Sequence, residues 1–175
     1  MPGHRTHDGT HYGTQRTRIA IDGVPDLLIR ARADRTQFHD PQRHADRLGI
    51  SSATWPLFGL PWPRGVALAE RMAKRPVSRT ERILEIGCGL ALPSLVAHRR
   101  GAHMTASDCH PLASSFLRAN LRLNGLAPLS YRHGQWNVQA REQARGGERS
   151  GSVVRGRYDL IVGSDLLYER DARGG

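Results

Sequence analysis

The stretch that decides the fold is Ile83-Leu84-Glu85-Ile86-Gly87-Cys88-Gly89-Leu90-Ala91. Its first four residues form a short, mostly apolar run typical of a buried parallel strand, and the glycines that follow are typical of a tight turn. A helix is predicted from about Leu92 to Arg100, because Pro93 suits a first helical turn and Gly101 suits a helix end. The sequence therefore predicts a strand, a glycine turn and a helix in succession.

Strands and helices alternate on both sides of this stretch. A helix is predicted from Pro63, and further on we expect a strand over 102–107, a helix over 111–123, strands over 129–135 and 158–163, and a surface loop over 139–157. Such alternation produces a parallel sheet with right-handed crossovers and helices on both faces. The predicted fold class is α/β, with a doubly wound, mostly parallel, Rossmann-like sheet.

Composition divides the 175 residues into three parts. Residues 1–20 are rich in Gly, His, Thr and Arg and are predicted to be a disordered leader. Residues 21–62 are predicted to be an N-terminal cap segment, with one or two short helices within 20–54. Residues 63–175 then form the ligand-binding domain, incomplete at its C-terminus.

The compartment is predicted from what the sequence lacks. No apolar run approaches the roughly 18 to 20 residues that a membrane span needs. The two cysteines, Cys88 and Cys109, do not make a disulfide framework, and neither has a partner at zinc spacing. We therefore expect a protein of the reducing cytoplasm, without a membrane partner and without a metal.

The formal charge of +10 raises the question of a nucleic-acid partner. Half of this charge lies in two segments predicted to be unstructured, residues 1–20 with a net +2 and residues 139–157 with a net +3. Arginine also outnumbers lysine 25 to 1, a skew more typical of codon composition than of a phosphate-binding surface. Both observations argue against nucleic acid as the partner.

Three residues predict a ligand site at the carboxyl edge of the sheet. Gly87 and Gly89 let the backbone approach a ligand closely, at the N-terminus of the following helix. Asp108 lies 19 residues beyond Gly89, near the spacing of about 20 at which an acidic side chain binds ribose hydroxyls. A dinucleotide site would also need glycine at the position of Leu92, which argues against an NAD-linked oxidoreductase.

The pattern Glu85-x-Gly87-x-Gly89-x-Ala91 resembles motif I of the class I S-adenosylmethionine (SAM) dependent methyltransferases, with Ala91 in place of the third glycine. Asp165-Leu166-Leu167-Tyr168 resembles the D-x-x-Y motif of their protein-lysine methyltransferase branch. The resemblance covers roughly residues 55–168, and further pieces of that branch stand in the same order: Trp62, Asn120 with Asn124, and Trp136.

This resemblance implies that the cofactor is SAM and that the reaction is methyl transfer to a nitrogen. Asp165 would accept a hydrogen bond from the acceptor nitrogen, and Tyr168 would line the acceptor channel. The aromatic faces of the two tryptophans would suit a flat adenine and a cationic sulfonium. The implied cofactor contacts come from eight residues: Trp62, Glu85, Gly87, Cys88, Gly89, Asp108, Trp136 and Ser164.

The acceptor stays open at this point. The D-x-x-Y branch implies a protein lysine side chain, while a small-molecule amine and a non-catalytic SAM-fold remnant are the alternatives. Leu166 and Leu167 occupy the proline positions of an N-P-P-Y signature, which argues against base amino groups and glutamine amides as acceptors. Since class I enzymes continue through further strands, we expect residues 158–163 to form an exposed apolar sheet edge. That edge predicts marginal stability and a tendency to self-associate.

Overall fold

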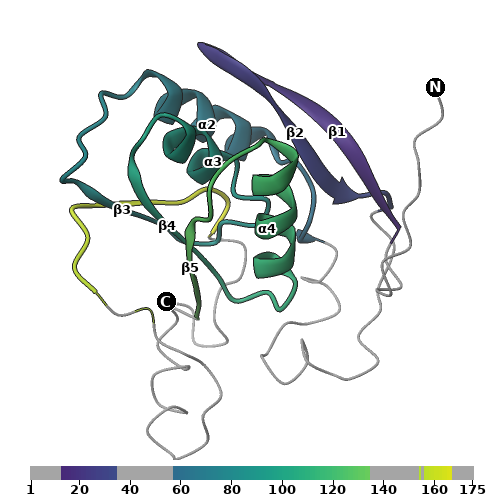
Figure 1. The fold of residues 1–175 in the computed structure, drawn as a ribbon. Helices are drawn as coiled ribbons and strands as arrows, with labels where there is room; N and C mark the ends of the chain where they lie inside the picture. Colours follow the sequence, from purple (N-terminus) through teal and green to yellow (C-terminus); the bar gives the residue numbers. More distant parts are fainter. Residues whose placement is uncertain (1–12, 35–56, 135–153, 155, 167–175) are drawn as a thin grey trace, which may run out of the picture.

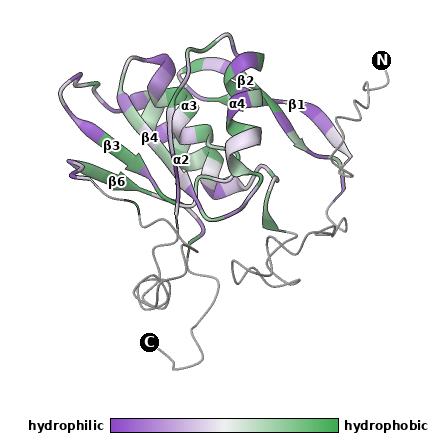
Figure 2. Cartoon of the chain, turned by 60° about the horizontal axis from the view of Figure 1, so that its bottom comes forward, coloured by the Kyte–Doolittle hydropathy of each residue, from purple (hydrophilic) through white to green (hydrophobic). Residues whose placement is uncertain are grey.

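The computed structural model describes residues 13–34, 57–134, 154 and 156–166 (Figure 1). Figures 1 and 2 show three layers, a sheet, a layer of helices and a separate two-stranded hairpin. In chain order the elements are β1 (Thr14–Ile21), β2 (Val24–Arg32), α2 (Pro63–Lys74), β3 (Arg82–Glu85), α3 (Leu92–Arg99), β4 (His103–Asp108), α4 (Ala113–Leu123), β5 (Ser130–His133) and β6 (Leu160–Val162).

The sheet is parallel, and its strands lie in the order β5-β4-β3-β6. The chain runs outward from β3 to β5 and then returns to the other side of β3 to form β6. In open α/β sheets, ligands bind at the carboxyl ends of the strands beside such a reversal. The predicted Rossmann-like α/β fold is confirmed. Within the described ranges, α2, α3 and α4 all lie on one face of the sheet, where helices on both faces were expected (Figure 2).

The N-terminal part of the prediction is wrong where the structure describes it. Residues 14–20, assigned to the disordered leader, belong to β1, and residues 24–32, within the segment 20–54 where one or two short helices were expected, form β2. The two strands pair antiparallel, with Ile21 opposite Val24. Asp22-Gly23 makes the turn, and Gly23 has a left-handed φ of 86°, which glycine adopts without steric cost. An Asp-Gly pair between segments of strand-forming residues strongly predicts a hairpin. Here that local signal is a better guide to the structure than the polar composition, which had suggested disorder.

The hairpin contributes one apolar face to the main core. Leu27 and Ile29 on β2 are completely buried, and they belong to the same buried cluster as Leu95 of α3 and Leu117 of α4. Because β2 alternates strictly here, its other face carries Leu28 and the arginines. The hairpin is therefore part of the folded domain and not a loose cap over it.

Two asparagines, Asn120 in α4 and Asn124 directly after it, attach the hairpin to the helix layer. The Asn124 side-chain amide accepts a hydrogen bond from Leu28 N–H at 3.0 Å and donates one to Leu28 C=O at 2.8 Å. The Asn120 Oδ1 accepts the N–H of Arg30 at 2.8 Å, and this side chain is completely buried. The Asn-x-x-x-Asn pair thus bonds the backbone of β2 in the way that a neighbouring strand would.

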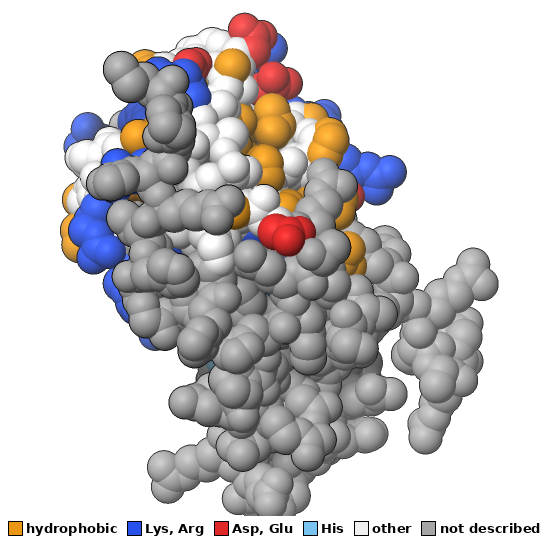
Figure 3. Space-filling view, turned by 90° about the vertical axis from the view of Figure 1, so that its right-hand side faces the viewer, with side chains coloured by type: hydrophobic (Ala, Val, Ile, Leu, Met, Phe, Trp, Pro, Cys, Tyr) orange, Lys and Arg blue, Asp and Glu red, His pale blue; other side chains and the backbone are white. Residues whose placement is uncertain are grey.

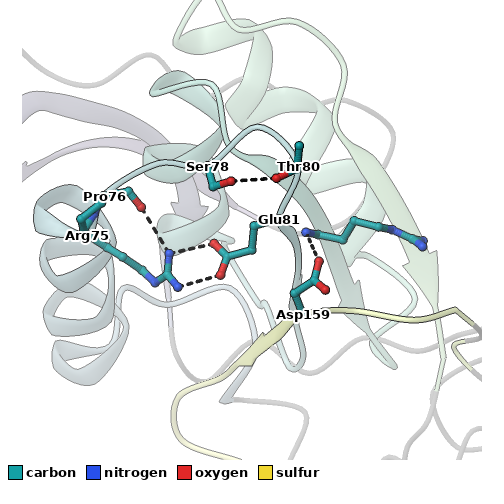
Figure 4. A network of polar contacts seen from close by, with 7 residues as sticks. Arg75, Pro76, Ser78, Thr80, Glu81 and Asp159 are labelled. Atoms are coloured by element: carbon teal, nitrogen blue, oxygen red, sulfur yellow. Dashed lines mark hydrogen bonds and ion pairs between the residues drawn. The ribbon is translucent and has the colours of Figure 1, made fainter.

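Charged side chains hold the connection between α2 and β3 (Figure 4). Arg75 makes two parallel hydrogen bonds of 2.7 Å to Glu81, a bidentate arrangement that closes the loop over residues 75–81. Next to it, the Asp159 Oδ2 accepts the N–H of Arg82 at 2.7 Å, and the Asp159 N–H donates to Arg82 C=O at 2.8 Å. The two bonds between Arg82 and Asp159 hold the start of β3 beside the segment that leads into β6.

Within the described residues, β6 pairs only with β3 and ends the sheet on that side. Its central residue, Ile161, is 58% exposed. An apolar side chain on an unpaired edge is the arrangement expected from the sequence, while the marginal stability and self-association inferred from it stay predictions. No helix in the described ranges is long and apolar enough to cross a membrane.

The face on the hairpin side carries basic groups on both flanks, with acidic and hydrophobic side chains between them (Figure 3). Lys74 pairs with Asp22 at 2.6 Å, and Arg18 approaches Asp26 at 3.7 Å. In this view the described basic side chains are interspersed with acids and do not gather into one phosphate-binding patch.

Candidate cofactor site at the carboxyl edge of the sheet

The turn between β3 and α3 has three residues in left-handed backbone conformations. Gly87, Gly89 and Ala91 have φ values of 58°, 51° and 60°. A Cβ added to Gly89 would meet no atom within 4 Å, so the space over this glycine is open. The N–H of Cys88 donates to Ser107 C=O at 3.0 Å and ties the turn to β4. The result is an open backbone surface at the N-terminus of α3, suited to close approach by a ligand.

Ala91 stands where the related motif has glycine, and it adopts the glycine conformation. It is completely buried and immediately precedes α3. A left-handed φ costs a residue with a side chain about 1 to 2 kcal/mol. We expect Ala91→Val to lower the free energy of unfolding by about 3 kcal/mol, since a β-branched side chain adds strain and overpacking there.

Urea denaturation measures this cost, and Ala97→Val is the matched control. Ala97 is also buried but lies inside α3, so its valine variant adds bulk without the left-handed conformation. Equal losses for the two valine variants would show that backbone strain at Ala91 is not important.

Asp108 joins the glycine turn to the end of β4. Its Oδ2 accepts the N–H of Gly89 at 2.7 Å, and its Oδ1 accepts the N–H of His110 at 2.7 Å. Burial raises the pKa of this carboxyl above its ordinary value, although the two N–H donors act in the opposite direction. A carboxylate accepts about four hydrogen bonds, so Asp108 retains capacity for a ligand hydroxyl beside these N–H donors.

Glu85 is directed at the first turn of α3. Its Oε2 accepts the N–H of Ser94 at 2.9 Å and also the Ser94 hydroxyl hydrogen. The side chain is 2% exposed, and burial raises its pKa to about 8. In this structure the Glu85 carboxyl bonds Ser94 and holds the start of α3 in place. The influence on the cofactor expected from the sequence would therefore be indirect, through the position of the glycine turn.

Residues at the end of β6 meet the N-terminus of α2. A Cβ added to Gly65, in the first turn of α2, would lie 3.8 Å from the Ser164 Oγ. Asp165 has a left-handed φ of 54°, and its carboxylate is paired with Arg64 at 3.4 Å. Trp62 immediately precedes the helix, and its indole N–H donates to Leu57 C=O at 2.9 Å. The structure thus brings Trp62, Ser164 and Asp165 to one end of α2.

The remaining expected residues divide into two groups. Cys88 is buried within the glycine turn, where burial raises the pKa of its thiol, and neither Cys88 nor Cys109 forms a disulfide within the described residues. Trp136 and Tyr168 lie outside the described residues, as does most of the loop expected over 139–157. Their roles stay predictions.

Sequence reasoning missed His110 and Tyr131 at this edge. The Tyr131 hydroxyl donates to Asp108 C=O at 3.1 Å, and burial raises the pKa of that hydroxyl. His110 is 5% exposed and stacks on Phe58. The signal for His110 was its position two residues after an aspartate that ends a strand, since such an aspartate often accepts the N–H of residue i+2.

The chain is similar in sequence to curated lysine methyltransferases. No family model matches the chain. It is 27% identical over 164 residues to the rat electron transfer flavoprotein beta subunit lysine methyltransferase, covering 91% of this chain and 57% of the relative. It is 29% identical over 123 residues to the zebrafish protein N-lysine methyltransferase METTL21A, covering 70% and 50%. The chain therefore spans about half the length of these curated relatives.

Among solved structures, the Pyrococcus abyssi tRNA (uracil-54, C5)-methyltransferase in complex with S-adenosyl-L-homocysteine is similar, with a TM-score of 0.47 and 16% identity. That match covers 86% of this chain and 28% of the other. The chain is similar in sequence to curated protein lysine methyltransferases, and its parallel sheet has the Rossmann-like α/β fold.

Proposed function

We propose that this protein binds SAM at the carboxyl edge of β3 and β4 and transfers its methyl group to a nitrogen acceptor. The observation that carries the proposal is Asp108. Its carboxylate is held by N–H groups from two loops, next to a glycine with open space above it. That combination of a fixed acceptor and accessible backbone suits a ligand with ribose hydroxyls and a flexible polar tail.

The described residues fit this cofactor. Asp108 would accept the ribose hydroxyls, and the backbone of Gly87, Cys88 and Gly89 would face the methionine part. Trp62 and Ser164 would complete the site from the side of α2, and Trp136 would add a second aromatic face. When bound, SAM supplies an electrophilic methyl group on a sulfonium.

The chain's own part in the reaction would be to orient the acceptor. Asp165 already carries a cationic partner, since Arg64 pairs with it at 3.4 Å. A carboxylate that attracts a guanidinium also attracts the ammonium or amine of a lysine side chain. We propose that Asp165 aligns the acceptor nitrogen and that Tyr168 lines its path. Alignment of this kind lowers a barrier by up to about 7 to 11 kcal/mol.

For the acceptor we propose a protein lysine side chain. Support comes from the names of the relatives, which describe lysine methyltransferases, and from the D-x-x-Y segment. The electron transfer flavoprotein beta subunit is the first acceptor to test, because it is named in several relatives. We further propose residues 63–175 as the catalytic unit and a reducing, cytoplasmic setting, in keeping with two cysteines that form no disulfide within the described residues.

The cofactor is tested by isothermal titration of the chain with SAM, S-adenosylhomocysteine (SAH) and NAD. We expect micromolar binding of SAM and SAH and no binding of NAD. Asp108→Ala should weaken SAH binding about a hundredfold, because each hydrogen bond from a ribose hydroxyl to a charged carboxylate is worth about 1.5 to 3 kcal/mol.

Asp26→Ala is the control, since Asp26 lies on the hairpin and is not part of the proposed site. Equal SAH affinity in the Asp108 variant and the wild type would contradict the role of Asp108. Binding of NAD in place of SAM would contradict the proposed function itself. Transfer of labelled methyl from SAM to the flavoprotein beta subunit, reduced in Asp165→Asn, then tests the acceptor.

A further inference from the structure

A stacked ring pair lies beneath the proposed ribose site and has no role in the function described so far. The rings of Phe58 and His110 are 3.8 Å apart between centroids and only 5° from parallel. Both residues are at least nine-tenths buried, at 8% and 5% exposure. Phe58 also contacts the edge of the Phe116 ring, at 5.3 Å and 80°. The His110 ring is therefore held on one face by an aromatic side chain that is itself anchored in the core.

His110 contacts Asp108 through its backbone and controls the turn through its side chain. The His110 N–H donates to the Asp108 Oδ1 at 2.7 Å. Its Nδ1 accepts the N–H of Leu112 at 3.2 Å, which fixes the chain just before α4. The position of the His110 ring thus determines where the His110 backbone N–H lies. That N–H in turn fixes the position of the Asp108 Oδ1.

The stack also connects two parts of the chain that are distant in sequence. Phe58 lies in the turn that the indole N–H of Trp62 closes by donating to Leu57 C=O. That turn leads directly into α2, whose first turn carries Arg64 beside Asp165. The ring pair is therefore the contact through which the turn before α2 supports the loop after β4.

We propose that His110 is a positioning residue for the cofactor ribose, acting through Asp108, and that its stack on Phe58 is what holds it in place. This inference rests on the proposed SAM-binding function. Asp108 is held from two sides, by the N–H of Gly89 in the turn after β3 and by backbone N–H groups of the loop after β4, that of His110 among them. Loss of either loop's position rotates the carboxylate away from the hydroxyls it would accept.

Two ligands, three test variants and one control variant test the proposal by calorimetry. The ligands are SAH and its analogue without the 2′ and 3′ ribose hydroxyls. His110→Asn keeps an acceptor for the Leu112 N–H but removes the ring, and Phe58→Leu removes the other half of the stack. His110→Phe keeps a stacking ring and removes the acceptor. Phe116→Leu is the control, because it loosens the core around Phe58 without breaking the stack.

We expect His110→Asn and Phe58→Leu to weaken SAH binding about tenfold, the upper range for loss of an aromatic pair. Binding of the dideoxy analogue should change less than about twofold, since the effect acts through the ribose hydroxyls. His110→Phe should restore SAH affinity to within about twofold of the wild type. Phe116→Leu should lower the melting temperature and leave the ratio of the two affinities unchanged.

Equal losses for both ligands, or unchanged SAH affinity in Phe58→Leu, would overturn the proposal. So would a His110→Phe variant as weak as His110→Asn, because the ring would then not be the relevant feature. If the His110 variants do not fold, Phe58→Leu alone decides. Failure of the wild-type chain to bind SAH is a separate result, and it would refute the proposed function together with this inference.

Discussion

Glu85→Gln is expected to make the protein more stable than the wild type at alkaline pH, with the difference growing steadily between pH 5 and pH 8. Burial raises the pKa of Glu85 from 4.5 to about 8. Over that range the folded protein holds a proton that the unfolded chain has released, so the free energy of unfolding falls as the pH rises. At about 1.4 kcal/mol per pH unit, the loss above pH 8 is roughly 5 kcal/mol, and glutamine avoids it.

The measurement is the melting temperature of both proteins from pH 5 to pH 9. The two curves should lie closest together at the acidic end, where the pH is nearest to the unfolded pKa of 4.5, and separate as the pH rises. Some slope should persist in the variant, because the pKa of Asp108 is also raised by burial. Ser94→Ala is the companion variant: it removes a donor that lowers the pKa of Glu85 and should extend the loss to higher pH. Parallel curves would contradict the assignment.

Asn124→Ala is expected to lower the free energy of unfolding by about 3 kcal/mol. The substitution leaves the N–H and C=O of Leu28 without the amide that bonds them, and it removes an acceptor from Arg99 at 3.0 Å. Each net hydrogen bond contributes about 1 kcal/mol, and each unsatisfied buried group costs about 1 to 3 kcal/mol.

Urea denaturation gives the global loss, and hydrogen exchange at the Leu28 amide gives the local one. Arg118→Ala is the matched control on the same helix, since its side chain is exposed and bonds only to Ser114 in the described structure. We expect it to change stability by less than about 0.5 kcal/mol. Unchanged exchange at Leu28 in the Asn124 variant would show that the hairpin does not depend on this amide.

The sequence predicts best what is encoded locally. The apolar run before Gly87, the proline near the start of α3 and the aspartate that ends β4 each act within a few residues, and the structure has a strand, a helix and a strand end at these places. The hairpin had an equally local signal in Asp22-Gly23. The prediction of a disordered leader gave more weight to the polar composition around this pair, and so the hairpin was missed.

Other features depend on contacts that a local pattern does not contain. The resemblance placed Asn120 and Asn124 in order, but their bonds to β2 join residues about 90 positions apart. The stack of His110 on Phe58 joins a loop before α2 to a loop after β4 in the same way. Glu85 was expected beside the cofactor, and its direction toward Ser94 follows from how α3 begins. The roles of the site residues stay proposals until the titrations are made.

The bond between Leu28 and Asn124 spans 96 residues, and this separation matters during synthesis. A two-stranded hairpin alone is at best marginally stable in water. At about 5 to 20 residues per second, the ribosome adds the helix that completes it roughly 5 to 20 seconds after the hairpin itself. We therefore expect the N-terminal hairpin to wait, incompletely folded, until α4 emerges, so that a ribosome-bound chain arrested before residue 113 leaves the amides of β2 open to exchange.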